Sequence, residues 1–139
     1  MSREKLNNTE KYKTFKKAFD TFEYYLNEKN FIGAYVLSFS ILEDRLNASY
    51  YLLHDKLQKK RPTKFKAFNK KLKFLLENHY INKQEYKSIQ KAAKERNKKL
   101  HAAMWNLNEF SEDDCQRLIP LVRHLDKISR KIKKELKLN

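Results

Sequence analysis

The stretch FIGAYVLSFSILEDRLNASYYLLHDKLQ, residues 31–58, decides the fold of this protein. Its apolar side chains recur every three or four positions, which is the period of an α-helix that buries one face. Glu43 interrupts this stripe, so we expect its carboxylate to be largely buried and to bond to a neighbouring helix, most simply to Arg96. The stripe consists of Ile32, Val36, Phe39, Leu46, Tyr50, Leu53 and Leu57.

A helix is predicted on either side of this stretch. Residues 9–28 carry an apolar stripe that includes Tyr12 and Phe22. After the basic linker at residues 59–62, Pro62 is expected to open a helix over residues 62–78 that turns its lysines outward.

Capping boxes predict the starts of two later helices. In a capping box the residue that caps the helix is followed three positions later by an acidic residue. The pairs are Asn82 with Glu85 and Ser111 with Asp114, and they predict helices over residues 82–106 and 111–136. Pro120 lies inside the second of these helices, so we expect a kink there.

Composition favours the same all-helical structure. The chain has one Gly and two Pro among 139 residues, which leaves few positions for tight turns. We therefore expect an all-α, up-and-down bundle of about five helices that forms a single domain over residues 1–139. The one cysteine, Cys115, suits a reducing compartment, and no signal peptide or membrane span is evident, so a cytoplasmic protein without membrane contact is expected.

The charge indicates an anionic partner. The formal net charge is +15, and residues 56–73 contain nine basic side chains and no acidic one. A basic surface of this kind attracts polyanions, nucleic acid foremost. The alternative interpretation is that lysine simply covers every solvated helix face, and lysine enrichment alone does not distinguish the two.

One short stretch, ERNKKLHAAMW at residues 95–105, combines features found nowhere else in the chain. Arg96 falls on the apolar stripe of its helix, where a charge is costly unless it meets a partner. His101 follows five positions later, at the edge of the same face. Small residues flank the pair at positions 92, 93, 102 and 103, which would let another helix or a substrate approach.

An arginine, a polar residue directly after it and a histidine shortly beyond, on the fourth helix of a small all-helical chain, resemble the signature of the HEPN superfamily of ribonucleases and nucleotide-binding domains. Arg96, Asn97 and His101 fill these places, and Glu43 matches the inward polar residue that the family often carries on its second helix. The resemblance covers about residues 31–124 at the level of helix order. It implies a single HEPN-like domain, a homodimer in which two motif helices meet, and a toxin or antiphage-defence role with an antitoxin protein as a conceivable partner.

The chemistry of these residue types fits RNA cleavage. Without a metal, the ribose 2′-OH attacks the adjacent phosphorus, which needs a base, an acid and positive charge around the transition state. His101 titrates near neutrality and Arg96 stays protonated with a planar fork that suits phosphate oxygens. Asn97 would hold the phosphate or orient His101. The lysines expected to bind RNA are Lys64, Lys66, Lys70, Lys98 and Lys99.

Other familiar chemistry is missing from the sequence. There is no glycine-rich phosphate loop, no Cys-x-x-Cys pair and no His-Glu-x-x-His motif. His54, His79 and His124 are expected at the surface or at its boundary, too far apart in sequence for a helical metal site. We therefore expect neither a metal nor a cofactor.

Two hypotheses from different classes remain. The first is a metal-independent endoribonuclease whose composite Arg96/His101 site lies at a homodimer interface. The second is a non-catalytic helical module that binds nucleic acid, a nucleotide or a partner protein, in which Arg96 merely pairs with Glu43.

Two features of the motif count against a simple site within one chain. Five residues turn an ideal helix by about 500°, which leaves Arg96 and His101 roughly 140° apart around the axis. Ala103 also stands where toxins of the family that pair with nucleotidyltransferases carry a tyrosine, so regulation through that tyrosine is not expected.

Overall fold

The structure, a computed structural model, describes residues 8–62, 66–105 and 110–138. Its described elements are all helices, so the predicted all-α fold is confirmed. The fifth predicted helix is divided in two, at residues 112–117 and 119–138. In chain order the helices are α1 (Asn8–Asn27), α2 (Phe31–Lys56), α3 (Phe68–Glu77), α4 (Lys83–Ala102), α5 (Glu112–Arg117) and α6 (Ile119–Leu138).

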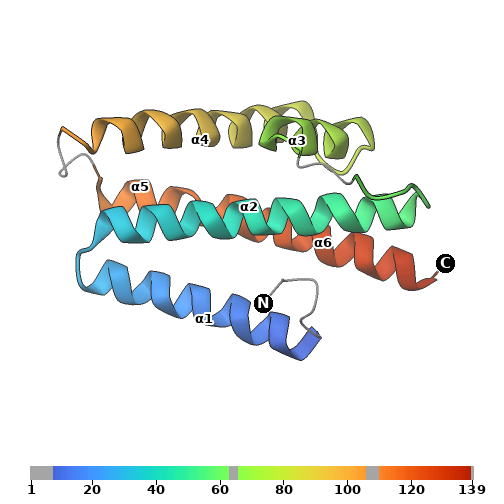
Figure 1. Ribbon diagram of the computed structural model, residues 1–139, viewed down its shortest axis with the longest axis horizontal. Coiled ribbons are helices and arrows are strands. Elements are labelled where there is room, and N and C mark those ends of the chain that lie inside the picture. The colour runs from blue at the N-terminus through green and yellow to red at the C-terminus, as the bar shows by residue number, and fades with distance from the viewer. Residues whose placement is uncertain (1–7, 63–65, 106–109, 139) are drawn as a thin grey trace.

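Helix α2 occupies the centre of the bundle (Figure 1). It packs most extensively against α6, and also against α1, α3 and α5. Helices α3 and α4 form a layer on one side of it and α1 lies on the other. Residues from all six helices join one hydrophobic core, which includes Phe22, Leu42, Leu72, Ile89 and Leu125.

Because α2 is central, it is buried on more than the single face that its stripe predicts. Ile41 and Leu42, which lie off the predicted stripe, are 4% and 0% exposed, whereas Val36 and Leu57 on the stripe are 42% and 37% exposed. Tyr12, expected on the buried face of α1, is also exposed. Periodicity thus identified α2 as a helix but gave its packed faces only in part.

Three of the helices end on a residue with positive φ: Lys29 after α1, Gln58 after α2 and His79 after α3, at 59°, 55° and 65°. In each case the next amide bonds back to a carbonyl in the last turn of the helix, as from Asn30 N to Tyr25 O at 2.8 Å. This is the arrangement that glycine usually provides at the end of a helix. The sequence gives no sign of these ends, because none of these positions is a glycine.

The helix starts are partly as predicted. Asn82 and Ser111 form complete capping boxes at α4 and α5, with Glu85 and Asp114 as their partners. The start of α3 at Pro62 is wrong: residues 66 and 67 lie outside any helix and α3 begins at Phe68. The Phe68 ring stacks on Phe39 of α2, so a tertiary contact accompanies this start.

The kink expected at Pro120 takes the form of a one-residue break in the helix at Leu118, whose backbone stays in the right-handed helical region with φ −79° and ψ −20°. Helix α5 stops at Arg117, and Pro120 occupies the first turn of α6, where its missing N–H leaves no helical hydrogen bond unmade. The break sets α5 across the start of α2, where the Cys115 thiol donates to the carbonyl oxygen of Phe31 at 3.1 Å. Within the described ranges, no helix is both long and apolar enough to cross a bilayer.

Candidate functional site

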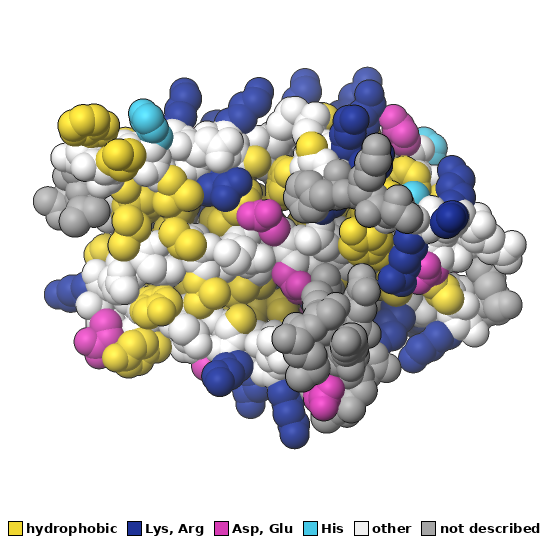
Figure 2. Space-filling view, in the orientation of Figure 1, with side chains coloured by type: hydrophobic (Ala, Val, Ile, Leu, Met, Phe, Trp, Pro, Cys, Tyr) yellow, Lys and Arg dark blue, Asp and Glu magenta, His cyan; other side chains and the backbone are white. Residues whose placement is uncertain are grey.

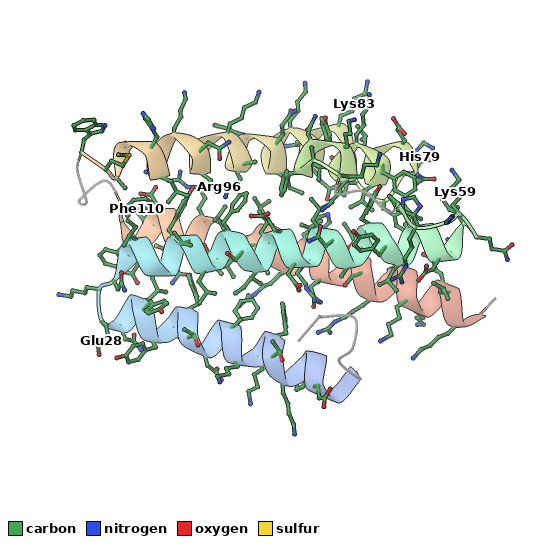
Figure 3. The ribbon with its side chains drawn as sticks, in the orientation of Figure 1. Glu28, Lys59, His79, Lys83, Arg96 and Phe110 are labelled. Atoms are coloured by element: carbon green, nitrogen blue, oxygen red, sulfur yellow. The ribbon has the colours of Figure 1, made fainter. Side chains whose placement is uncertain are left out.

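Three side chains of α2 form a row toward α4. Tyr35, Phe39 and Glu43 are four residues apart, so they lie above one another on one helix face. Arg96 projects from α4 toward α2 in Figure 3. Its guanidinium carbon lies 4.3 Å from the centre of the Phe39 ring, and its Nη1 lies 3.8 Å from Oε1 of Glu43. The arginine therefore has an aromatic and an anionic partner on α2.

The predicted contact between Glu43 and Arg96 is present, but the predicted burial of Glu43 is wrong. The Glu43 side chain is 41% exposed and that of Arg96 is 32% exposed. An ion pair in this environment contributes about 0–1 kcal/mol, because water screens it. Within the described residues, the Nε of Arg96 is buried without a hydrogen-bond partner. The contacts therefore orient the guanidinium without using all of its donors.

Tyr35 is a neighbour of Arg96 that the sequence analysis missed. Its side chain is buried, and its ring packs against that of Phe110 with the centroids 5.1 Å apart. Burial, with the nearby Glu95 and Asp114 carboxylates, raises the pKa of the Tyr35 hydroxyl to about 12, although the charge of Arg96 acts in the opposite direction. Its place one turn before Phe39 on the row that faces α4 is the signal that could have found it.

Lys99 was expected to bind RNA, but it faces α5. Its Nζ lies 3.1 Å from Oδ2 of Asp114 and 5.8 Å from the centre of the Phe110 ring. Although burial opposes ionisation of Asp114, hydrogen bonds from Lys99 and Ser111 lower the pKa of its carboxyl. The predicted role of Lys99 as a surface contact is therefore not supported by its position, and the side chain links α4 to α5.

His101 points away from this cluster. Its side chain is exposed in the last turn of α4, and that of Asn97, one turn earlier, is exposed as well. The structure therefore does not bring Arg96 and His101 together within one chain, in agreement with the roughly 140° that separates them around an ideal helix axis. Arg96 faces α2, whereas His101 faces solvent.

The surface beside His101 differs from the one expected. Ala92 and Ala103 are 7% exposed, because they pack into the core of their own chain. The uncovered side chains here are Met104 and Trp105, which are 77% and 83% exposed. Met104 and Trp105 are therefore the apolar surface available to a partner beside His101.

The basic run at residues 56–73 is partly used inside the molecule. Lys56 donates to Glu135 and Tyr80 at 2.6 and 2.7 Å, and Arg61 pairs with Asp55. Lys71, expected to point outward, is 3% exposed and donates to Asn47 at 2.6 Å. Of the lysines predicted to bind RNA, Lys70 and Lys98 are exposed, Lys66 is half-buried and Lys64 lies outside the described residues.

In the part of the chain that the structure describes, no three His, Cys, Asp or Glu side chains group as a metal site would require. Comparison of the chain with models of protein families, with curated proteins and with solved structures gives no match. The interpretation of the site therefore rests on its own geometry and on the Arg96–His101 pattern.

Proposed function

We propose that this protein is a metal-independent endoribonuclease of the HEPN type, an effector of the toxin or antiphage-defence kind. Arg96 and His101 would form a composite site at the interface of a homodimer. The observation that carries the proposal is the placement of the two residues at one end of α4. Arg96 is oriented by Phe39 and Glu43 but remains one third exposed, and His101 is uncovered five residues later.

The chemistry assigns a role to each residue. A His101 imidazole takes the proton of the ribose 2′-OH, whose oxygen attacks the adjacent phosphorus and displaces the 5′ oxygen. A second acid protonates that leaving oxygen, and the product is a 2′,3′-cyclic phosphate. The Arg96 guanidinium donates to the phosphate oxygens as negative charge develops, which lowers the energy of the transition state. Asn97, exposed beside Arg96, is placed to hold a phosphate oxygen.

A second copy of the chain would supply the second imidazole that the reaction needs. A two-fold contact brings the same residues together from both subunits, so two His101 rings can serve as base and acid. It can also place Arg96 of one subunit near His101 of the other, since the two diverge within a single chain. Met104 and Trp105 are the apolar side chains that such a contact would cover.

The test is RNA cleavage by the purified protein in EDTA. We expect cleavage to persist in the chelator, to leave a 2′,3′-cyclic phosphate end, and to disappear in His101→Ala and in Arg96→Ala while helix content stays unchanged. His79→Asn serves as a control, because His79 is exposed at the end of α3, away from Arg96 in Figure 3, and asparagine tolerates its positive φ. Full activity in the His101→Ala protein would contradict the assignment.

A second candidate function is favoured by the contacts of Arg96. Its partners, Phe39 and Glu43, are what a purely structural arginine would also have. On this hypothesis the chain is a non-catalytic helical module that binds nucleic acid, a nucleotide or a partner protein. It predicts RNA binding without cleavage, and Arg96→Ala would then lower stability without changing any activity.

A further inference from the structure

Helix α4 carries a straight row of lysines on its outer face. Their positions differ by four, four, three and four residues, which keeps all of them on one side of the helix. Each is exposed, and Figure 2 shows lysine and arginine side chains along the edge over α4. At 1.5 Å per residue the row is about 22 Å long. This lysine row consists of Lys83, Lys87, Lys91, Lys94 and Lys98.

The lysine row is little neutralised by acidic side chains. Lys91 lies 3.9 Å from Glu95, and among the described residues none of the other four lysines forms an ion pair. The other acidic side chain of α4, Glu85, turns toward His124 of α6. The row therefore presents nearly its full charge to solvent.

A second line of exposed cations runs along α6, at Arg123, Lys127, Arg130, Lys134 and Lys137, so exposure alone does not single out the row on α4. On the outer side of α6, Arg130 pairs with Asp126 at 3.0 Å and Lys131 lies over the Tyr80 ring. In the run at residues 56–73, Lys56 and Arg61 pair with carboxylates. What distinguishes the row on α4 from the line on α6 is therefore its place on the helix that carries His101, not its charge alone.

The lysine row also borders a shallow hollow at one end and leads toward His101 at the other. A shallow hollow of about 370 Å³ lies along its first half, lined by Lys83, Gln84, Lys87, Ser88 and Lys91. Its other end leads through Lys98 to the exposed His101, three residues further along α4. A polymer held along the row would therefore be delivered to the histidine.

We propose that the lysine row binds the phosphate backbone of single-stranded RNA and leads it to His101. A single line of cations along one helix can follow one phosphodiester backbone. Cleavage through the 2′-OH also needs a backbone free to align its oxygen with the leaving group, which a duplex prevents. The inference names the substrate class for the proposed nuclease and rests on that function only for the direction toward His101.

The test measures binding apart from cleavage. The probe is a fluorescent oligouridylate carrying 2′-O-methyl groups, which the proposed reaction cannot cut, titrated by anisotropy at several salt concentrations. We compare the wild-type protein with Lys83→Gln/Lys87→Gln/Lys94→Gln. The matched control is Lys127→Gln/Lys134→Gln/Lys137→Gln, which removes equal charge from exposed positions on α6.

Neutralising three phosphate contacts should reduce the slope of log affinity against log salt by about 2, since each single-strand contact contributes about 0.7. The α6 control should change it far less. Equal effects of the two triple variants would overturn the inference, because binding would then follow net charge. So would a preference for duplex RNA, or equal displacement of the probe by polyglutamate and by unlabelled RNA.

Failure of this inference can be told apart from failure of the nuclease assignment. RNA that is cut normally by the α4 triple variant, with unchanged affinity, removes the lysine row as the binding surface and leaves the nuclease in place. Probe binding that depends on the row, in a protein that cuts no RNA, keeps the row and removes the nuclease.

Discussion

The guanidinium of Arg96 is held by contacts that orient it more than they stabilise the fold. Its cation–π contact with Phe39 and its half-exposed pair with Glu43 each contribute about 1 kcal/mol or less in such surroundings. The sequence predicted the partner correctly, because Glu43 breaks an apolar stripe on the facing helix. It gave the burial wrongly, since periodicity shows on which face a side chain lies but not how well a neighbouring helix covers that face.

His54 is the residue whose environment departs most from expectation. It was predicted at the surface or at its boundary, yet it is only 9% exposed, with its ring stacked on that of Phe74 at a centroid distance of 4.5 Å and meeting Tyr50 edge-on. Among the described residues neither ring nitrogen has a hydrogen-bond partner. Its position one turn after the buried Tyr50 is the signal that was available.

Stability should therefore fall as the solution is acidified. Burial lowers the pKa of His54, and the nearby Lys59 charge lowers it further, although Asp55 opposes this. The unfolded ring takes up its proton near pH 6.5 and the folded ring only at lower pH, so the unfolded chain binds more protons in between. We expect the free energy of unfolding in urea to decrease from about pH 7.5 to 5.5 by more in wild type than in His54→Phe, at about 1.4 kcal/mol per unit of pKa depression.

His79→Asn is the control for this comparison, because His79 is exposed and asparagine tolerates its positive φ. It should keep the wild-type pH dependence. An identical pH profile for His54→Phe and wild type would show that the buried ring does not govern acid stability.

At the scale of the helices, the sequence predicted best what local signals control. The capping boxes at Asn82 and Ser111 place the starts of α4 and α5, because cap hydrogen bonds involve residues only three positions apart. The start of α3 was missed, since Phe68 packs on Phe39, which is far away in sequence. The positive-φ ends of α1, α2 and α3 were missed because lysine, glutamine and histidine, unlike glycine, do not indicate a left-handed backbone conformation.

Replacing one of these residues with glycine should stabilise the protein. Lys29 is exposed and has φ of 59°, a conformation that costs an L-residue about 1–2 kcal/mol. Glycine avoids this cost, but it loses more chain entropy on folding, so only part of the gain remains. We expect Lys29→Gly to raise the free energy of unfolding by about 0.5–1 kcal/mol in urea denaturation. Lys29→Ala, which removes the same charge but keeps a Cβ, should give no such gain; a gain of equal size there would assign the effect to charge.

At the scale of the whole molecule, the proposed nuclease should be a homodimer. Two chains that each carry +15 repel one another, so added salt or a bound anion should favour association. We expect light scattering to give twice the chain mass of 16.9 kDa. Mixing His101→Ala with wild type should give heterodimers of much reduced activity, since each cleft would lose one of its two imidazoles.

Trp105→Glu tests where the interface lies. Trp105 is 83% exposed beside His101, so a charge there should dissociate the dimer without unfolding the chain. Tyr24→Glu, at a 60% exposed position on α1, should leave the dimer intact. A monomer that cleaves RNA at full rate would rule out the composite site while leaving the residue assignments open to test.

The all-α bundle followed from the sequence because hydrophobic period, composition and caps all favoured it. The charge pattern did not follow in the same way. In the longest basic run, at residues 56–73, three side chains are bound by Glu135, Asp55 and Asn47, whereas on α4 Glu85 faces His124 and, among the residues that the structure describes, only Lys91 of the lysine row has a carboxylate partner, Glu95. Which cations remain available depends on tertiary pairing, and a linear sequence does not show it.

The reactivity of the buried Cys115 thiol reports how α5 separates from α2. Cys115 is 0% exposed, and burial raises its pKa to about 11, so at neutral pH it offers an alkylating reagent neither access nor thiolate. Its hydrogen bond to Phe31 ties α5 to the first turn of α2. Modification requires an opening that separates α5 from α2, so the rate of labelling reports the equilibrium population of the open state when reclosing is fast, and the opening rate when the reagent reacts before the site recloses.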